Sequence, residues 1–321
     1  MTTRRRSFLV AGAAASFGLS GAARAAWPDK PIRFVVSFAP GTATDNLARV
    51  LAESIAADLS QPIVIDNKPG AQGSIGANQV AKAPADGYTI LVGSATTQAA
   101  AASLLKTIPY DPVRDFAPIT KLGHIAQVLV VPAESPHRDV AALVAHARAH
   151  PGKVNYGTGS SGNLLPSATL VKRLGLDIAR VTYRSPPQAM ADVLGGSVQF
   201  MFIDVSAALG QIRAGKLRAL AVSSAQPSAL LPGVPSIAAT LPGFELLTWF
   251  AMYAPSGTDG AIVARLNASA RKALADTAIA SRLADMGFEV YGSTPDELRA
   301  FTAAEVAKWR TLVAETGIEP E

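Results

Sequence analysis

The stretch Trp27–Asp45, which reads WPDKPIRFVVSFAPGTATD, predicts a strand, a tight turn and the start of a helix. Its segment Ile32–Phe38 is rich in β-branched and aromatic residues, a composition typical of a buried strand. Pro40–Gly41 ends this strand, and Thr42 and Thr44 are both suited to cap the following helix. A helix N-terminus behind a glycine turn presents free backbone N–H groups, so we expect an anion to bind here.

Strand-like and helical runs alternate along the rest of the chain. We expect strands at Arg33–Phe38, Ile63–Asn67, Thr89–Gly93, Val128–Val131, Val154–Gly157, Val181–Tyr183, Phe200–Ile203 and Ala219–Ser223. We expect helices at Asp45–Leu59, Ser74–Lys82, Val140–His150, Leu164–Leu174, Gln188–Leu194, Ser206–Ala214, Gly260–Asp276, Ala278–Met286 and Pro295–Thr316. Such alternation predicts an α/β fold in which parallel-rich sheets are flanked by helices.

The length of the chain favours two domains, because about 296 residues after an N-terminal signal exceed one comfortable core. The strand-helix pattern starts afresh after Val131, and an apolar strand near Thr248–Pro255 leads back to a helical C-terminal block. We therefore predict a discontinuous first domain, residues 26–123 plus 246–321, and a second domain, residues 124–245. Two crossings between domains make a hinge, which predicts a clamshell with a ligand cleft between the domains.

Several blocks of the sequence carry a resemblance to one family. They are Asn67–Gly73, Ala85–Gly93, Tyr110–Ile119, His150–Gly162, Val181–Ala189, Leu194–Phe202, Gly215–Val222 and Ala254–Thr258. Together with the first turn, they resemble the Bug-type solute receptors of tripartite tricarboxylate transporters over nearly the whole mature chain. The resemblance implies a type II-like periplasmic binding protein that captures a small carboxylated metabolite (a di- or tricarboxylate, an amino acid or an aromatic acid) and delivers it to membrane transporter subunits.

Four positions depart from the usual pattern of that family. Thr42 stands where a second glycine is usual, and Ser185 also replaces a glycine. Leu165 lies near a customary histidine, and Ala239 replaces a usual glutamate. Because Thr42 and Ser185 are near the expected pocket, these departures bear on the identity of the ligand and leave the fold unaffected.

The N-terminus, residues 1–25, has the features of an export signal. Arg4–Arg6 is a basic region, Phe8–Leu19 is apolar but short for a membrane span, and Ala23–Ala25 gives an A-x-A cleavage site. The run Arg5–Leu9 fits the twin-arginine pattern R-R-x-F-L. An ordinary Sec signal and a retained anchor are the alternatives. We expect a periplasmic protein without a stable membrane anchor.

Composition excludes several functional classes. Lys and Arg number 29 and Asp and Glu 24, and four of the arginines lie in the signal, so the mature chain has a net charge near +1. This balance gives no argument for nucleic acid or a membrane surface as a partner. The absence of cysteine excludes disulfides, thiolate catalysis and an N-terminal lipid anchor. We expect a soluble monomer.

A second glycine-rich turn, GTGSSG at Gly157–Gly162, follows a predicted strand and precedes a helix. Its glycines let the backbone approach a ligand, and its hydroxyls and helix N-terminus suit a carboxylate. The run also fits G-x-G-x-x-G, with Asp177 at a suitable distance for a ribose contact. An exported nucleotide-dependent oxidoreductase is therefore the alternative function. The run can also be a tight turn that binds no ligand. A third function is that of a sensory partner that presents its ligand to a membrane receptor.

Further polar residues follow the ends of other predicted strands. The run Gly93–Gln98 offers four polar side chains, either to a small solute or as caps of the next helix. Arg184 is the one cation placed to face the cleft, with a surface ion pair as the alternative. Asp204 could meet an ammonium group or cap the helix from Ser206.

The predicted site therefore binds a ligand and carries out no reaction. His146 and His150 have the spacing of a metal pair, but no acidic partner lies within their helix, and neither H-E-x-x-H nor G-x-S-x-G occurs. We assign no catalytic residue, metal or cofactor. The predicted ligand-binding residues are Phe38, Ala39, Gly41, Thr42, Ala43, Thr44, Asp45, Ser94, Thr96, Thr97, Thr158, Gly159, Ser160, Ser161, Arg184, Ser185 and Asp204.

The export signal yields a direct test. We expect protein isolated from the periplasm to have lost its first 25 residues and to begin at Ala26, because cleavage follows the A-x-A site. Intact-mass measurement of the periplasmic fraction checks this. Full-length protein in the membrane fraction would contradict it.

Overall fold

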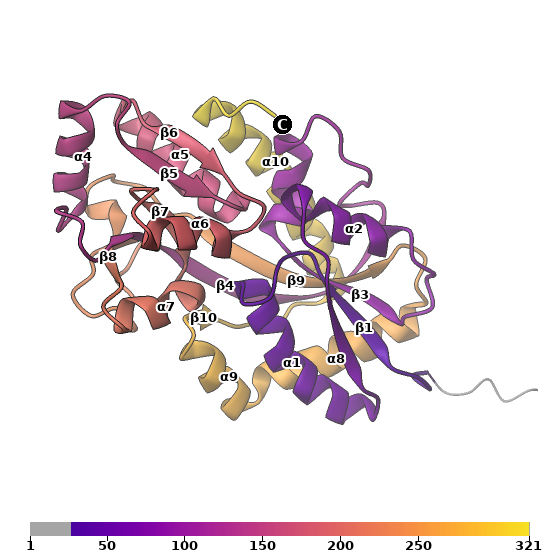
Figure 1. The fold of residues 1–321 in the computed structure, drawn as a ribbon. Helices are drawn as coiled ribbons and strands as arrows, with labels where there is room; N and C mark the ends of the chain where they lie inside the picture. Colours follow the sequence, from indigo (N-terminus) through magenta and orange to yellow (C-terminus); the bar gives the residue numbers. More distant parts are fainter. Residues whose placement is uncertain (1–26, 321) are drawn as a thin grey trace, which may run out of the picture.

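The structure is a computed structural model that describes residues 27–320, and the predicted signal lies outside the described residues. Figure 1 shows two α/β halves on either side of a shared central region, through which the strands β4 and β9 run. The N-terminal strands β1 to β3 and the C-terminal helices α8 and α10 belong to the same half.

The first half contains a mixed sheet. Its strand order is β10-β4-β9-β3-β1-β2. These strands are β1 (Ile32–Val36), β2 (Ile63–Asn67), β3 (Thr89–Ser94), β4 (Phe116–Pro132), β9 (Leu247–Pro255) and β10 (Phe288–Glu289). β1 lies parallel to β2 and β3, whereas β9 is antiparallel to both β3 and β4. The chain therefore returns to this sheet through β9 after it has built the second half.

The second half is built around the last part of β4. Residues Gln127–Val130 pair with β7 (Met201–Asp204), and Val128–Pro132 pairs with β8 (Leu217–Val222), both antiparallel. β5 and β6, whose bounds are Asn155–Thr158 and Ala179–Thr182, form a parallel pair. The Gly157 N–H donates to the Phe200 carbonyl at 3.1 Å, which places β5 beside β7.

Helices cover both faces of these sheets (Figure 1). The α-helices are α1 (Ala43–Leu59), α2 (Ser74–Ala81), α3 (Ala101–Leu104), α4 (Val140–Ala149), α5 (Ser161–Arg173), α6 (Pro186–Leu194), α7 (Val205–Arg213), α8 (Gly260–Ala275), α9 (Thr277–Ala284) and α10 (Pro295–Thr316). Single-turn helices lie at η1 (Ala71–Gly73), η2 (Thr96–Ala100) and η3 (Ile237–Ala239). In the units β1–α1, β5–α5 and β7–α7, the strand is joined to its helix directly or by a short turn, so the helix begins just beyond the end of the strand.

The buried apolar residues form two clusters, and each cluster extends through both halves. One contains Phe34, Leu51 and Phe250 of the first half together with Met201 and Ile203 of the second. The other likewise joins residues of the first half, such as Leu91 and Tyr253, to residues of the second. Because both clusters cross β4, burial of apolar surface holds the halves together as well as each half by itself.

The C-terminal helix α10 packs on η2 and β4 and also contacts α5 of the second half. Thr294 caps it in a capping box with Glu297, which fixes where the helix begins. The buried Trp249 Nε1 donates to Glu305 Oε2 at 2.7 Å, and the Tyr253 hydroxyl lies 2.7 Å from Thr302 Oγ1. These bonds attach α10 firmly to β9.

The sequence-based expectation of parallel sheets holds for the β1, β2 and β3 pairs and for β5 with β6, but every pair that involves β4 or β9 is antiparallel. The expected strand Val128–Val131 is only the last part of β4. Register shifts between Pro118 and Thr120 and between Lys121 and Gly123 break the alternation of side chains in its first part. A period-two pattern cannot be recognised across such bulges.

The proposed domain boundaries fall at this shared region. The boundary after Gly123 lies inside β4, and the boundary before Leu246 lies directly ahead of β9. The division into residues 26–123 plus 246–321 and residues 124–245 remains a prediction about how the halves move.

Gly123 offers a test of the β4 bulge. Its φ of +118° lies outside the range that L side chains favour, and a Cβ there would be 2.1 Å from the Glu289 carbonyl oxygen of β10. We expect Gly123→Ala to lower the free energy of unfolding by at least about 2 kcal/mol. Chemical denaturation measures this change.

The matched control is Gly210→Ala, at an exposed position of helix α7, where a Cβ would meet nothing within 4 Å. We expect it to be neutral or to stabilise by up to about 1 kcal/mol. Equal stability of the two variants would show that the bulge does not constrain β4.

Candidate functional site

A narrow cavity lies between the two halves, where several strands end. Its lining comes from the turns after β1, β3, β5, β6 and β7 and from β9. The residues are Phe38, Thr42, Thr44, Ser94, Thr96, Ser160, Pro186, Asp204, Thr248 and Phe250. About 10 Å³ is accessible to the centre of a water molecule, which is room for about one water. The location beyond the carboxyl ends of strands is where open α/β sheets bind ligands.

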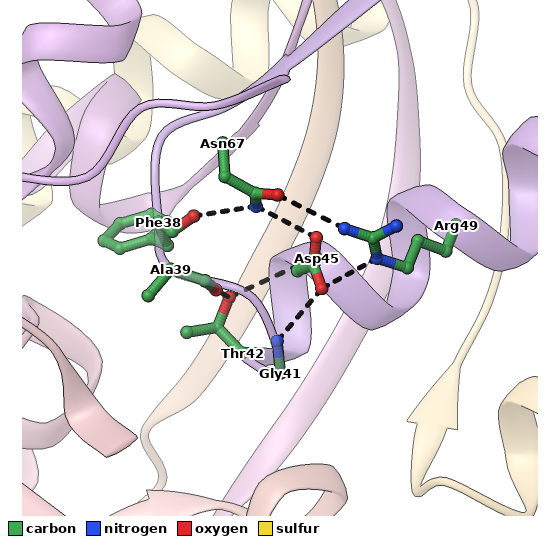
Figure 2. A network of polar contacts seen from close by, with 7 residues as sticks. All are labelled: Phe38, Ala39, Gly41, Thr42, Asp45, Arg49 and Asn67. Atoms are coloured by element: carbon green, nitrogen blue, oxygen red, sulfur yellow. Dashed lines mark hydrogen bonds and ion pairs between the residues drawn. The ribbon is translucent and has the colours of Figure 1, made fainter. Parts of the chain in front are cut away.

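The first wall of the cavity is the turn between β1 and α1, which a buried carboxylate holds in shape (Figure 2). Asp45 Oδ2 accepts from the Gly41 N–H at 3.0 Å and from Arg49 Nε at 2.9 Å. Asn67 Nδ2 donates to Asp45 Oδ1 and to the Phe38 carbonyl, both at 2.9 Å. Both oxygens of Asp45 are therefore occupied by the turn itself, so the predicted ligand residue Asp45 acts here as a support.

The ionisation of Asp45 follows from these contacts. Burial by itself would raise the pKa of Asp45, but the hydrogen bonds from Arg49, Asn67 and Gly41 outweigh it and lower the pKa below its usual value. The carboxylate stays charged. Thr42 caps the helix, since its Oγ1 accepts from the Asp45 N–H at 3.4 Å and donates to the Ala39 carbonyl at 2.9 Å.

The second wall is the turn Gly157–Gly162 between β5 and α5. Asn163 Oδ1 accepts from the Ser160 hydroxyl at 3.0 Å and from the Gly159 N–H at 3.4 Å. A Cβ on Gly159 would lie 2.2 Å from the carbonyl carbon of Ser185, so the starts of α5 and α6 touch backbone to backbone. Glycine is required at this point because only a residue without a side chain permits the approach.

The dinucleotide interpretation of this turn is not supported by the geometry. Asp177 precedes β6, whereas the glycine turn follows β5, and the two strands are parallel. Asp177 and the glycine turn therefore lie at opposite ends of the strand pair, so Asp177 cannot reach a ribose held at the turn.

The turn after β3 forms the third wall and contacts the other half directly. Thr97 Oγ1 accepts from the Ser94 N–H and donates to the Ser94 carbonyl, each at 3.1 Å. Thr96 Oγ1 lies 2.6 Å from Ser161 Oγ, a buried hydrogen bond between η2 of the first half and α5 of the second. The halves are therefore closed on each other in this structure.

Gln127 of β4 is the centre of a buried polar network at the floor of the cavity. Its Nε2 donates to Asp204 Oδ1 and, at 2.9 Å, to Thr248 Oγ1 of β9. Its Oε1 accepts from Asn163 Nδ2 at 3.4 Å. One side chain thus ties together both strands that join the halves and the start of α5.

Asp204 stands at the N-cap position of α7 but makes no capping bond, so the expectation that it caps this helix is wrong. Burial raises its pKa to about 6, although the hydrogen bond from Gln127 acts in the opposite direction. Asp204 is the one residue of the lining with an ionisable side chain.

The electrostatic character of the cavity comes from backbone groups. The starts of α1, α5, α6 and α7 all meet at the lining, through Thr42, Ser160, Pro186 and Asp204. No lysine, arginine or histidine lines it. Helix N-termini carry partial positive charge and unpaired N–H groups, so this arrangement is suited to an anion without a cationic side chain.

The structure brings both predicted glycine turns to one cavity. Predicted residues that line it are Phe38, Thr42, Thr44, Ser94, Thr96, Ser160 and Asp204. Predicted residues that lie in the adjoining turns or in their hydrogen bonds are Ala39, Gly41, Ala43, Asp45, Thr97, Thr158, Gly159, Ser161 and Ser185. We expected Arg184 to face the cleft. In this closed structure Arg184 is exposed and does not line the cavity.

Sequence reasoning missed part of the lining and all of the floor. Pro186, Thr248 and Phe250 line the cavity, and Gln127 and Asn163 build the network beneath it. Asn163 directly follows the glycine turn and could have been included. Gln127 lies within a long strand, where no local signal distinguishes it.

Three larger hollows lie elsewhere within residues 27–320, away from the point where the four helix starts meet. One, of about 390 Å³, lies where α5 and α10 end and is lined by Lys172, Arg180 and Glu319. The second, of about 410 Å³, is lined by Glu134 and Lys216. The third, of about 650 Å³, is lined by His124, Glu245, Asp285 and Glu289. Within residues 27–320, no group of three or more His, Asp or Glu side chains could hold a metal ion.

Comparison with known proteins identifies the relatives of this chain. The family model described as "Tripartite tricarboxylate transporter family receptor" matches residues 47–318. Among the helices that the structure describes, none combines the length and apolar character needed to cross a bilayer.

Three solved structures are similar along their whole length. "R. palustris Rpa4515 with adipate" is 32% identical with a TM-score of 0.89, over 92% of this chain and 100% of that one. "Periplasmic binding protein BugD" is 33% identical with a TM-score of 0.87, over 92% and 100%. "MatC (Rpa3494) from Rhodopseudomonas palustris with bound malate" is 30% identical with a TM-score of 0.84, over 89% and 100%. The likeness confirms the periplasmic-binding-protein fold expected from the sequence.

The raised pKa of Asp204 predicts a pH-dependent stability. Because its pKa is about 6 in the folded protein and 3.8 in the unfolded chain, the folded state binds this proton more tightly, and stability falls as pH rises between these values. We expect Asp204→Asn to stabilise the ligand-free protein by about 1–3 kcal/mol at pH 8 and by little at pH 4. Denaturation at both pH values measures this.

The control is Asp192→Asn on α6. Asp192 accepts a hydrogen bond from the Tyr183 hydroxyl at 2.6 Å and lies outside the cavity lining. Asp192→Asn should give no gain in stability that increases with pH. A stability gain for Asp204→Asn of the same size at pH 4 and pH 8 would show that Asp204 is not a proton-linked group.

Proposed function

The chain belongs to the tripartite tricarboxylate transporter receptor family, whose members are solute-binding receptors and not enzymes, and from this we propose that it captures a small dicarboxylic acid in the periplasm. The family match and the similarity to BugD confirm the resemblance drawn from the sequence. The proposal specifies the ligand class, the location and the way in which the ligand is held.

The observation that carries the proposal is the meeting of four α-helix N-termini at one cavity that has no cationic side chain in its lining. Backbone N–H groups of this kind bind carboxylate oxygens by charge-assisted hydrogen bonds. The hydroxyls of Thr42, Thr44 and Ser160 add further donors and acceptors. Two walls in opposite halves favour a ligand with a carboxylate at each end.

The ligands named for two similar structures support the same class. One contains adipate and the other malate, and both are dicarboxylic acids. Their chains are 32% and 30% identical to this one, so we carry over the chemical class and leave the individual acid to experiment.

Binding by domain closure follows from the size of the cavity. Room for about one water cannot admit a dicarboxylic acid, so the halves must separate and close again around the ligand. The Thr96–Ser161 bond and the contact of α10 with α5 would break on opening, whereas β4 and β9 would remain and act as the hinge. The closed, liganded form would then dock on the membrane subunits of a tripartite transporter.

The function is tested with a panel of pure compounds. Differential scanning fluorimetry against malate, adipate and other di- and tricarboxylates, amino acids and aromatic acids should show a rise in Tm for a dicarboxylate. A ligand at 100 times its Kd stabilises the folded state by about 2.7 kcal/mol. Calorimetric titration then gives the affinity. A panel in which no dicarboxylate raises Tm would contradict the proposal.

Thr44→Asp tests the site itself. Thr44 is buried in the first turn of α1 and lines the cavity, and an aspartate is well tolerated in a first helical turn. We expect the fold to be retained while affinity for the dicarboxylate falls at least about 100-fold, because a fixed carboxylate repels the ligand and fills its place.

The matched control is Thr277→Asp. Thr277 is the first residue of α9 and is exposed, so the same substitution introduces the same charge in the first turn of a helix away from the cavity. We expect its affinity to equal that of the unmodified protein. Equal losses in both variants would assign the effect to net charge, and no loss in either would place the ligand elsewhere.

A further inference from the structure

Asp204 is an unusual residue for a cavity that is suited to an anion. The other nine residues of the lining are uncharged, and the four helix starts present partial positive charge. A carboxylate at this position occupies the kind of environment that a ligand carboxylate needs. An ionised Asp204 would therefore compete with the ligand for the favourable field.

The side chain is held for contact with the cavity and not for support of a helix. Aspartate is among the best N-cap residues, yet Asp204 makes no cap bond to α7. Its Oδ1 accepts from Gln127, and among the described residues no partner is recorded for Oδ2. The residue keeps some exposed surface although it lies deep in the protein.

Other ionisable groups do not control Asp204. Those on the elements packed against it, or in the loop before them, are Lys121 and His124 on β4, Lys172 and Arg173 on α5, Arg184 before α6, Asp192 on α6 and Arg213 on α7. Lys172, Arg173 and Arg213 lie in last helical turns, away from the cavity. Only burial and the Gln127 hydrogen bond shift the pKa of Asp204.

We propose that Asp204 takes up a proton from solvent when a dicarboxylate enters the cavity, so that the closed receptor holds its ligand against a neutral aspartic acid. In this step a solvent proton forms an O–H bond at Asp204 Oδ2, and the charge of the site rises by one unit. The neutral group then donates a hydrogen bond to a ligand carboxylate oxygen. This inference rests on the proposed function and adds its regulation by pH.

The electrostatic reason is the closeness of two carboxylates in a site with little room for water. Like charges that share such a site cannot both remain ionised, and the pKa of one of them rises strongly. The pKa of about 6 in the closed structure already lies near neutral pH, so a moderate further rise on ligand binding keeps the proton bound at pH 7. Gln127 Nε2 donates to Oδ1, which leaves Oδ2 as the position for the proton.

The alternative ligand is one that presents an ammonium group. An ionised Asp204 would pair with it, no proton would be taken up, and loss of the charge would abolish binding. The lining accommodates this ligand as well, because the helix starts could hold the carboxylate of an amino acid while Asp204 pairs with its ammonium group. The two cases differ in their proton balance.

The experiment is calorimetric titration with adipate and, separately, with malate at pH 6, 7 and 8. Each titration is repeated in two buffers of different ionisation enthalpy, which gives the number of protons taken up per ligand bound. At pH 7 and 8 free carboxylic acids are ionised, so they contribute little to this number. We expect uptake that approaches one proton at pH 7 and an affinity that falls up to about tenfold from pH 7 to pH 8.

Asp204→Asn mimics the protonated residue. Its Oδ1 can still accept from Gln127, and its Nδ2 can donate to the ligand. We expect this variant to bind the dicarboxylate at pH 7 with affinity within about threefold of the unmodified protein or better, without proton uptake and without the fall at pH 8. The control Asp192→Asn should behave like the unmodified protein.

The outcomes separate the two proposals. Binding of adipate or malate without proton uptake, or equal uptake by Asp204→Asn, would overturn the proton linkage and leave the proposed function intact. Loss of binding in Asp204→Asn, together with a preference for an amino acid over both acids, would assign the ammonium role to Asp204. Failure of adipate, malate and every other dicarboxylate of the panel to bind would overturn the dicarboxylate function and, with it, the linkage.

Discussion

The constraint on which the rest of the structure depends is that one strand belongs to both halves. The first part of β4 pairs with β9 and β10, and its last part pairs with β7 and β8. Both apolar clusters cross it, and Gln127 lies where its partners change. A strand paired on both sides cannot slip without a change in the register of two sheets, so the proposed opening would come from bending of β4 and β9. The proposed hinge and the floor of the cavity would therefore be the same piece of chain.

In the proposed function the cavity binds a charged ligand with backbone groups, and binding then depends on turn geometry. Side-chain cations would tolerate small shifts, whereas N–H groups at helix starts act only if each turn has its exact shape. Asp45 and Asn67 secure the first turn, and the contact of Gly159 with Ser185 secures the starts of α5 and α6. These residues would affect a bound ligand only through the turns that they stabilise. A list of polar residues drawn from the sequence therefore contains both residues that line the cavity and residues that stabilise its turns.

Two buried aspartates illustrate how environment decides a role. Asp45 receives hydrogen bonds at both oxygens and stays ionised, so it serves as a fixed anchor. Asp204 receives one bond from an uncharged amide, and burial raises its pKa. The first is suited to hold a turn at any physiological pH. The second, at the end of β7, is suited to respond to a ligand's charge.

The sequence by itself determined the strand-turn-helix units, the family and the two glycine turns that meet at the cavity, because each of these depends on local periodicity, turn chemistry or contiguous motifs. Only the tertiary structure decided that β4 is one strand, that β9 is antiparallel to its neighbours, and that Gln127 bonds to Thr248 at the floor of the cavity. It also decided that Arg184 is exposed and that Asp204 does not cap its helix. The physical reason is that bulges erase the alternation of side chains along β4, and the partner of a polar group depends on residues far away in the chain. The environment that sets a pKa is likewise built by burial, which no single segment contains.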